Sequence, residues 1–221
     1  INVMEFLINN PEALWVITVF YDLLLASLLF YFFGKEGLYL AIVLGIVLSN
    51  LQGGKVSDVV IFDRTFTVSM GAIMYSGIYF ATDLLSEKYG RREANRAVIL
   101  GALANIAVML TLVLSTFFLP SDVADSADEV HNAISTLAIY SPIFVIGSIT
   151  AYLISQLFDV WVFHKIKSIT GTRMLWLRNN FSTFTSQFID TFTVIFLLCS
   201  FGALPWDLFV GLLAVSYTHL T

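Results

Sequence analysis

Residues 147–190 read GSITAYLISQLFDVWVFHKIKSITGTRMLWLRNNFSTFTSQFID. Two apolar segments in this stretch carry the same polar phrase, Ser155-Gln156-Leu157-Phe158-Asp159 and Ser186-Gln187-Phe188-Ile189-Asp190, and a short basic connection separates them. An aspartate at the centre of a membrane helix costs about 2.5–3.5 kcal/mol to insert. Two such residues in helices of membrane length therefore indicate a function.

The composition of the whole chain predicts a membrane protein. Of its 221 residues 58% are hydrophobic and 12% are charged, whereas a soluble domain carries about 25% charge. Its mean hydropathy is +0.85. We therefore expect an all-α fold, a polytopic bundle of transmembrane helices. The single cysteine, Cys199, excludes an intramolecular disulfide and a cysteine-built metal site, and the first residues show no cleavable signal peptide.

Apolar runs of membrane length predict six or seven spans in one integral membrane transporter domain, residues 1–221. A tight turn at Gly34–Gly37 divides the first two spans, and Val59–Thr67 alternates enough to predict a short hairpin-like re-entry. The predicted spans are 13–33, 38–51, 68–85, 94–119, 138–163 and 177–201, with a partial span from 208.

The charges of the connections predict the orientation. Lys88–Arg92 and Lys165–Arg173 are basic, whereas Asp122–Glu129 is acidic. Because cytoplasmic loops carry an excess of Lys and Arg, both basic connections are expected in the cytoplasm. The N-terminus and Gly53–Lys55 are then external, and Gly34–Gly37 is cytoplasmic.

Both polar phrases lie on helical faces with the same order of groups. At 100° per residue, Ser148, Tyr152, Ser155 and Asp159 share one line, with Gln156 at its rim. The next span repeats this arrangement, with Gln187 at the rim of a face made by Asn179, Ser182, Thr183, Ser186, Asp190 and Thr193. Consecutive spans joined by a short loop run antiparallel and pack together, so the two faces are expected to meet.

Two hypotheses account for these faces. Hydroxyls and amides hold membrane helices together at about 0.6 kcal/mol per bond, which explains the serines but explains Asp159 and Asp190 poorly. A solute or ion pathway explains both kinds of residue. A carboxylate beside an amide suits the donor and acceptor edge of a guanine-like ring, although amino acids and cations also fit such groups.

Several motifs resemble those of one family, the queuosine-precursor transporters, also called the vitamin-uptake-transporter or YhhQ-like family. Asp83–Ala94, DLLSEKYGRREA, resembles the family signature D-x-x-x-E-x-Y-G-x-x-x-A. The resemblance runs from about Asn50 to Gly202. It also includes both Ser-Gln phrases with their aspartates, Trp176–Asn180 with Ser182-Thr183, and more loosely Asn50 and Lys55.

The resemblance implies a bacterial multi-pass inner-membrane importer of 7-deazaguanine precursors of queuosine, preQ0 or preQ1, that acts as a secondary transporter or facilitator. The repeated phrase and its matching helical faces predict that Asp190 and Gln187 bind the donor edge of such a ring, while Asp159 and Gln156 serve the opposing wall or a coupled proton. The expected substrate-binding residues are Asn50, Asp83, Glu87, Tyr152, Gln156, Asp159, Arg178, Asn179, Gln187 and Asp190.

Two other classes of function compete with this interpretation. A substrate-binding subunit of an energy-coupling-factor vitamin importer has a similar size and helical content, and it would need an ATPase and a coupling subunit. A membrane enzyme is disfavoured because the sequence lacks H-E-x-x-H, G-x-S-x-G and a Walker lysine. The expected partners are a purine-like solute and the lipid bilayer. No catalytic residue, cofactor, metal or nucleic acid is expected, and a homo-oligomer is left open.

Overall fold

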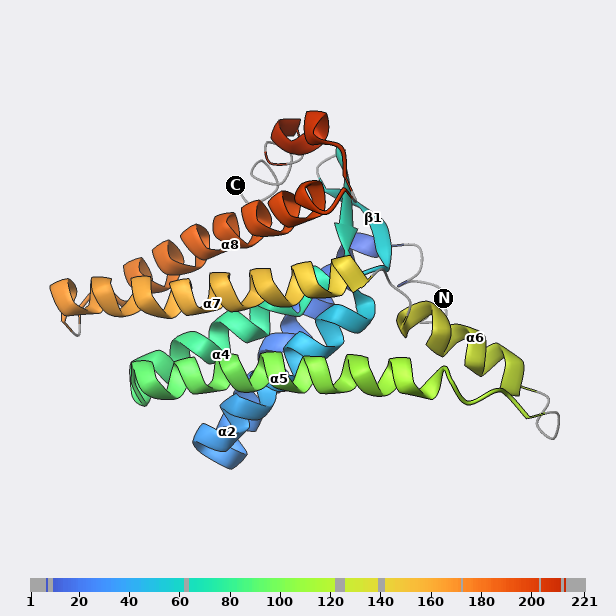
Figure 1. Ribbon diagram of the computed structural model, residues 1–221. Helices are drawn as coiled ribbons and strands as arrows, with labels where there is room; N and C mark the ends of the chain where they lie inside the picture. The colour runs from blue at the N-terminus through green and yellow to red at the C-terminus, as the bar shows by residue number, and fades with distance from the viewer. Residues whose placement is uncertain are drawn as a thin grey trace. The chain divides into compact units, whose positions relative to one another are not determined.

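The computed structural model describes residues 7, 10–61, 64–121, 126–138, 142–171, 173–202, 204–211 and 213, and these are mostly helical (Figure 1). They pack as two compact units that meet in sequence between Gly101 and Ala102. The single transporter domain stays a prediction. In chain order the elements are α2 Pro11–Gln52, β1 Val56–Ile61, β2 Arg64–Ser69, α3 Met70–Ile73, α4 Tyr75–Lys88, α5 Arg91–Ser115, α6 Ala127–Ala138, α7 Pro142–Thr170, α8 Leu175–Ser200 and the 3₁₀ turn η1 Trp206–Leu208.

Among the described residues, four helices are long and apolar enough to cross a membrane: α2, α5, α7 from Ile146, and α8. This finding confirms the all-α, multi-pass class. Large apolar side chains lie exposed on these helices, and Tyr31, Phe32 and Phe33 are 79%, 68% and 62% exposed. The 14 residues of α4 extend only about 21 Å, less than the roughly 30 Å hydrocarbon core.

The 42-residue helix α2 is a helical hairpin rather than one straight rod. Gly34 breaks it with φ 60° and ψ −127°, a conformation that glycine adopts without steric cost. A Cβ at Gly37 would collide with the Leu29 carbonyl oxygen, so the halves approach closely there. Residues of both halves, among them Asp22 and Leu48, line one narrow cavity. The reversal occurs at the predicted turn.

The β1–β2 hairpin and the broken helix α3–α4 follow α2. The strands pair antiparallel from Val56 opposite Ser69 to Ile61 opposite Arg64, which confirms the predicted hairpin, while its re-entry into the membrane stays a prediction. The third predicted span, 68–85, began too early because β2 extends to Ser69. Helix α3 then starts at Met70, and the helix is interrupted at Met74 before α4 begins.

The first unit buries its apolar core where the two halves of α2 pack on α4. Leu38, Ile42 and Ile46 from the second half, with Ile78 and Leu85 from α4, are all at most 1% exposed. Their spacing, four residues in α2 and seven in α4, places each set on one helical face. This packing fixes the position of α4, which carries Asp83 and Glu87.

The second unit departs from the predicted spans before residue 142. Helix α5 ends at Ser115 rather than at 119. The amphipathic helix α6 is absent from the predicted spans. Asp128 and Glu129, which the prediction assigns to the acidic loop, occupy its first turn, where carboxylates complement the helix dipole. Residues 122–125 of that loop lie outside the described residues.

Helices α7 and α8 pack along each other over most of their length (Figure 1). Helix α7 begins at Pro142, a residue favoured at the first helical position, and it continues through Lys165 and Lys167 to Thr170. The predicted span 138–163 was therefore placed too early, and only a short connection to Leu175 remains. Helix α8 lies within two residues of the predicted span 177–201. Of the partial span from 208, the structure describes only the residues up to 211 and residue 213.

Candidate functional site

The two polar phrases meet where α7 and α8 pack, and each one binds the other. The Ser155 hydroxyl donates to Asp190 Oδ1 at 2.9 Å, and the Ser186 hydroxyl donates to Asp159 Oδ1 at 3.1 Å. In each phrase the serine and the aspartate are four residues apart and therefore share a helical face. In an antiparallel pair the serine of one phrase then lies opposite the aspartate of the other. The expectation that the two faces meet is confirmed by these bonds.

The four residues Ser155, Asp159, Ser186 and Asp190 form what is here called the α7–α8 crossing, and its two aspartates differ in burial. Four residues of the two phrases are 0% exposed: Ser155, Gln156, Asp159 and Ser186. The Ser182 hydroxyl is a second hydrogen-bond donor to the Asp159 carboxylate. In contrast, Asp190 and Gln187 are half-buried. Asp190 thus keeps some exposed surface, whereas Asp159 is enclosed by protein.

Tyr152 lies one turn before Ser155 on α7 and is fully buried. Among the described residues its hydroxyl has no hydrogen-bond partner. Leaving a buried polar group unsatisfied costs about 1–3 kcal/mol. A water or a polar solute group beside Tyr152 would remove this cost, which agrees with its predicted place in the site.

Arg178 holds the connection between α7 and α8 in place through hydrogen bonds to its backbone. Its side chain is 0% exposed, and its Nη1 donates to the carbonyls of Gly171 at 3.2 Å and Arg173 at 3.0 Å. The guanidinium lies 5.5 Å from the centre of the Phe163 ring. These contacts support a structural role, and solute binding by Arg178 and its half-buried neighbour Asn179 stays a prediction.

The remaining three predicted site residues belong to the first unit. Asn50 lies near the end of α2, and its Nδ2 donates to the Ile46 carbonyl of the same helix at 3.0 Å. Asp83 is 6% exposed on α4, and Glu87 follows one turn later, half-buried.

Asp22 on α2 is a buried carboxylate that the sequence analysis did not select. It is 6% exposed, and its Oδ2 accepts from the Gly77 N–H at 2.6 Å and from the Ser76 hydroxyl at 2.9 Å. The available signal was an acidic residue in the middle of an apolar run, which by itself marks a candidate functional residue. The run had instead been interpreted as an ordinary first span.

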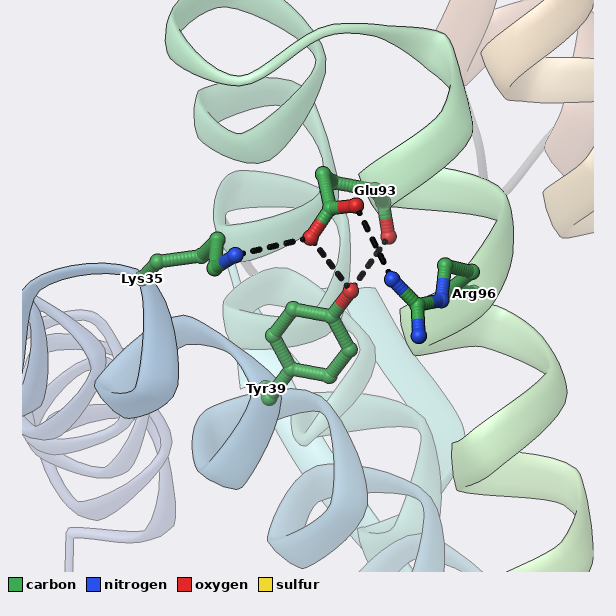
Figure 2. A network of polar contacts seen from close by, with 4 residues as sticks. All are labelled: Lys35, Tyr39, Glu93 and Arg96. Carbon is green, nitrogen blue, oxygen red and sulfur yellow. Dashed lines mark hydrogen bonds and ion pairs between the residues drawn. The ribbon is translucent and has the colours of Figure 1, made fainter.

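A charged network joins the Gly34 break of α2 to the start of α5 (Figure 2). Glu93 forms ion pairs with Lys35 at 3.0 Å and Arg96 at 3.2 Å. The Tyr39 hydroxyl donates to the Glu93 carboxylate at 3.1 Å and to its backbone carbonyl at 3.2 Å. The connections at 34–37 and 88–92 therefore lie on the same side of the first unit, as the predicted topology requires.

Comparison with known proteins identifies the family. Residues 69–219 match a family described as "Putative vitamin uptake transporter". Over 211 residues the chain is 36% identical to a Bacillus subtilis (strain 168) protein named "Probable queuosine precursor transporter", and the alignment covers 95% of this chain and 87% of the relative. No solved structure matches the chain. The family match includes α4 and both polar phrases, and the chain belongs to the vitamin uptake transporter family.

Proposed function

We propose that this chain imports a queuosine precursor, a 7-deazaguanine such as preQ0 or preQ1, across the bacterial cytoplasmic membrane. The observation that carries the proposal is the 36% identity, over 95% of the chain, to a protein named as a queuosine precursor transporter. That name favours transport by the chain itself over service as a subunit of an ATP-driven importer.

The α7–α8 crossing supports this function because it offers the hydrogen-bonding groups that a guanine-like ring needs. A carboxylate has about four acceptor positions, and the bond from Ser155 uses one position on Asp190. The remaining positions suit the paired N–H donors of the ring. The Gln187 amide, three residues earlier on α8, suits the ring carbonyl. Asp190 and Gln187 thus bind the solute, while the enclosed Asp159 and Gln156 form the opposing wall or carry a coupled proton.

The full transporter has six or seven spans. The hairpin in α2 supplies the first two spans, because each of its halves has about the length needed to cross the hydrocarbon core. The broken helix α3–α4 is the third span, and α5, α7 and α8 complete six. A seventh begins near η1.

Uptake is tested by measuring queuosine in tRNA, because imported precursor is converted into that nucleoside. A bacterial host unable to synthesise the precursor, and lacking its own transporter, is given this chain and a limiting supply of preQ0 or preQ1. Queuosine should appear in its tRNA, and cells carrying an empty vector should show none. Failure to restore queuosine by chain that has reached the membrane contradicts the proposal. Restoration only when an energy-coupling ATPase and its coupling subunit are co-expressed would establish the other importer class.

A further inference from the structure

The Asp22 carboxylate binds at the interruption between α3 and α4, the helical segment that follows the β-hairpin. Its two donors, Ser76 and Gly77, lie 54 and 55 residues further along the chain. Both belong to the first turn of α4. The contact therefore joins the first half of α2 to the start of α4, within one compact unit.

The break at Met74 makes these donors available. In an unbroken helix the Gly77 N–H would donate to the Ile73 carbonyl, but here it donates to Asp22 Oδ2, and the Ser76 hydroxyl lies 2.8 Å from that carbonyl. Met74, which precedes α4, provides no side-chain cap. The first N–H groups of a helix lack partners within it and form the positive end of its dipole. Asp22 thus caps α4 from another helix.

Glycine at position 77 is a requirement of this contact. A Cβ there would lie 2.6 and 2.7 Å from the two carboxylate oxygens of Asp22, which is closer than such atoms can approach. Glycine is otherwise unfavourable inside a helix. The close approach of Asp22 provides a reason for its presence in α4.

The contact of Asp22 with Ser76 and Gly77, here called the α2–α4 joint, lies at the depth where transporters bind their solutes. Asp22 is 11 residues after Pro11 and 11 before Phe33. At 1.5 Å per residue it is roughly 16 Å from each end of this half-helix, close to the middle of the hydrocarbon core. Interrupted helices near the midplane form solute and ion sites in many transporters.

We propose that Asp22 is a positioning residue for transport, which caps α4 and thereby sets the position of Asp83 and Glu87 along the helix axis. A helix is stiff, so a shift of its first turn moves the acids of the later turns with it. The inference rests on the proposed function, because it assumes that these two acids serve the solute.

Two substitutions disrupt the joint from opposite sides. Gly77→Ala expels the carboxylate while it improves the helix propensity of α4, and Asp22→Ala removes the carboxylate. Each should raise the KM for preQ1 uptake about tenfold at an unchanged protein level in the membrane, because loss of the charge-assisted hydrogen bonds to Asp22 lets α4 shift. The double variant should be no worse than either single one, because both remove the same contact. Asp22→Asn keeps an acceptor oxygen and should raise the KM by only about threefold.

Ser27→Ala is the matched control, because the Ser27 hydroxyl bonds the Leu23 carbonyl of the same helix, and its uptake should equal that of the wild type. Reduced protein level with an unchanged KM would show that Asp22 only stabilises the fold and would overturn the proposal, as would additive effects of the two substitutions. If the wild type imports no precursor, the proposed function is wrong. In that case the melting temperatures of the two single variants and the double variant in detergent test the joint by itself. If the double variant loses no more than one single variant, the cap is supported; if its loss is the sum of the two, the cap is wrong.

Discussion

The α7–α8 crossing and the α2–α4 joint both bury carboxylates in helices of membrane length, but they satisfy them with different donors. At the crossing, Asp159 and Asp190 each accept from a serine hydroxyl of the facing helix. At the joint, Asp22 accepts from a hydroxyl and from the backbone N–H of Gly77. A hydroxyl can reorient by rotation of its own side chain, whereas a backbone donor moves only with its helix, over microseconds or longer.

This difference separates two tasks. A hydroxyl can release a carboxylate to an incoming solute without any movement of the backbone, so the crossing suits reversible binding. The joint cannot open unless α4 moves, so it suits positioning. The following predictions test this division, starting from the largest expected effect.

The largest effect is expected at Asp190, the aspartate of the crossing that is not fully buried. Asp190→Asn keeps the shape of the side chain and removes its charge. Because hydrogen bonds to charged groups contribute roughly 1.5–3 kcal/mol, uptake at limiting precursor should fall about tenfold or more. Gln187→Ala should also reduce uptake, since it removes the neighbouring amide. The measurement is uptake of labelled preQ1 normalised to the amount of protein in the membrane.

A charge swap at the same crossing separates binding from helix association. Ser155→Asp combined with Asp190→Ser preserves a hydroxyl–carboxylate pair but moves the charge from α8 to α7. If the pair only holds the helices together, the swapped protein should transport like the wild type. Normal uptake by this variant, or by Asp190→Asn, would contradict solute binding by Asp190.

The two serines of the crossing should differ, although their bonds are reciprocal. Ser155→Ala releases the half-buried Asp190, so uptake should fall about threefold to fivefold while the protein level is kept. Ser186→Ala leaves the enclosed Asp159 with fewer donors, so the melting temperature in detergent should fall more than uptake per molecule does. If the two variants lose uptake and melting temperature to the same extent, the difference in burial between Asp159 and Asp190 has no effect on function.

A smaller effect is expected at the network around Glu93, which is charged but not enclosed. Its partner Lys35 has a side chain that is 37% exposed, and ion pairs exposed to water contribute little to stability. Glu93→Gln should therefore change uptake by about twofold or less. A loss as large as that of Asp190→Asn would show that the network takes part in transport.

No change in uptake is expected from cysteines placed to report orientation. In a chain carrying Cys199→Ser, the variants Arg91→Cys and Ser168→Cys should resist a membrane-impermeant thiol reagent in intact cells, and Asp125→Cys should react. The reason is the excess of basic residues in the connections assigned to the cytoplasm. Labelling at position 91 without labelling at position 125 would reverse the topology of both regions.

The crossing could be predicted from the sequence, and the joint could not. Ser155 and Asp159 repeat as Ser186 and Asp190 on consecutive helices, so local periodicity and antiparallel packing are enough to bring them together. Asp22 has no comparable repeat, since one of its donors is a backbone group 55 residues away. A backbone N–H leaves no trace in the sequence beyond the glycine that makes room.

The membrane class, the turn at Gly34, the polar faces of α7 and α8 and the motifs of the family could all be predicted, because composition, helical period and residue spacing are local properties of the chain. The three-dimensional packing was needed to learn which hydroxyl binds which carboxylate, that Arg178 holds a connection in place, and that α4 is short and capped by Asp22. Those features depend on which groups meet across distant segments, and in a membrane the need to satisfy each buried polar group selects among the pairings that packing allows.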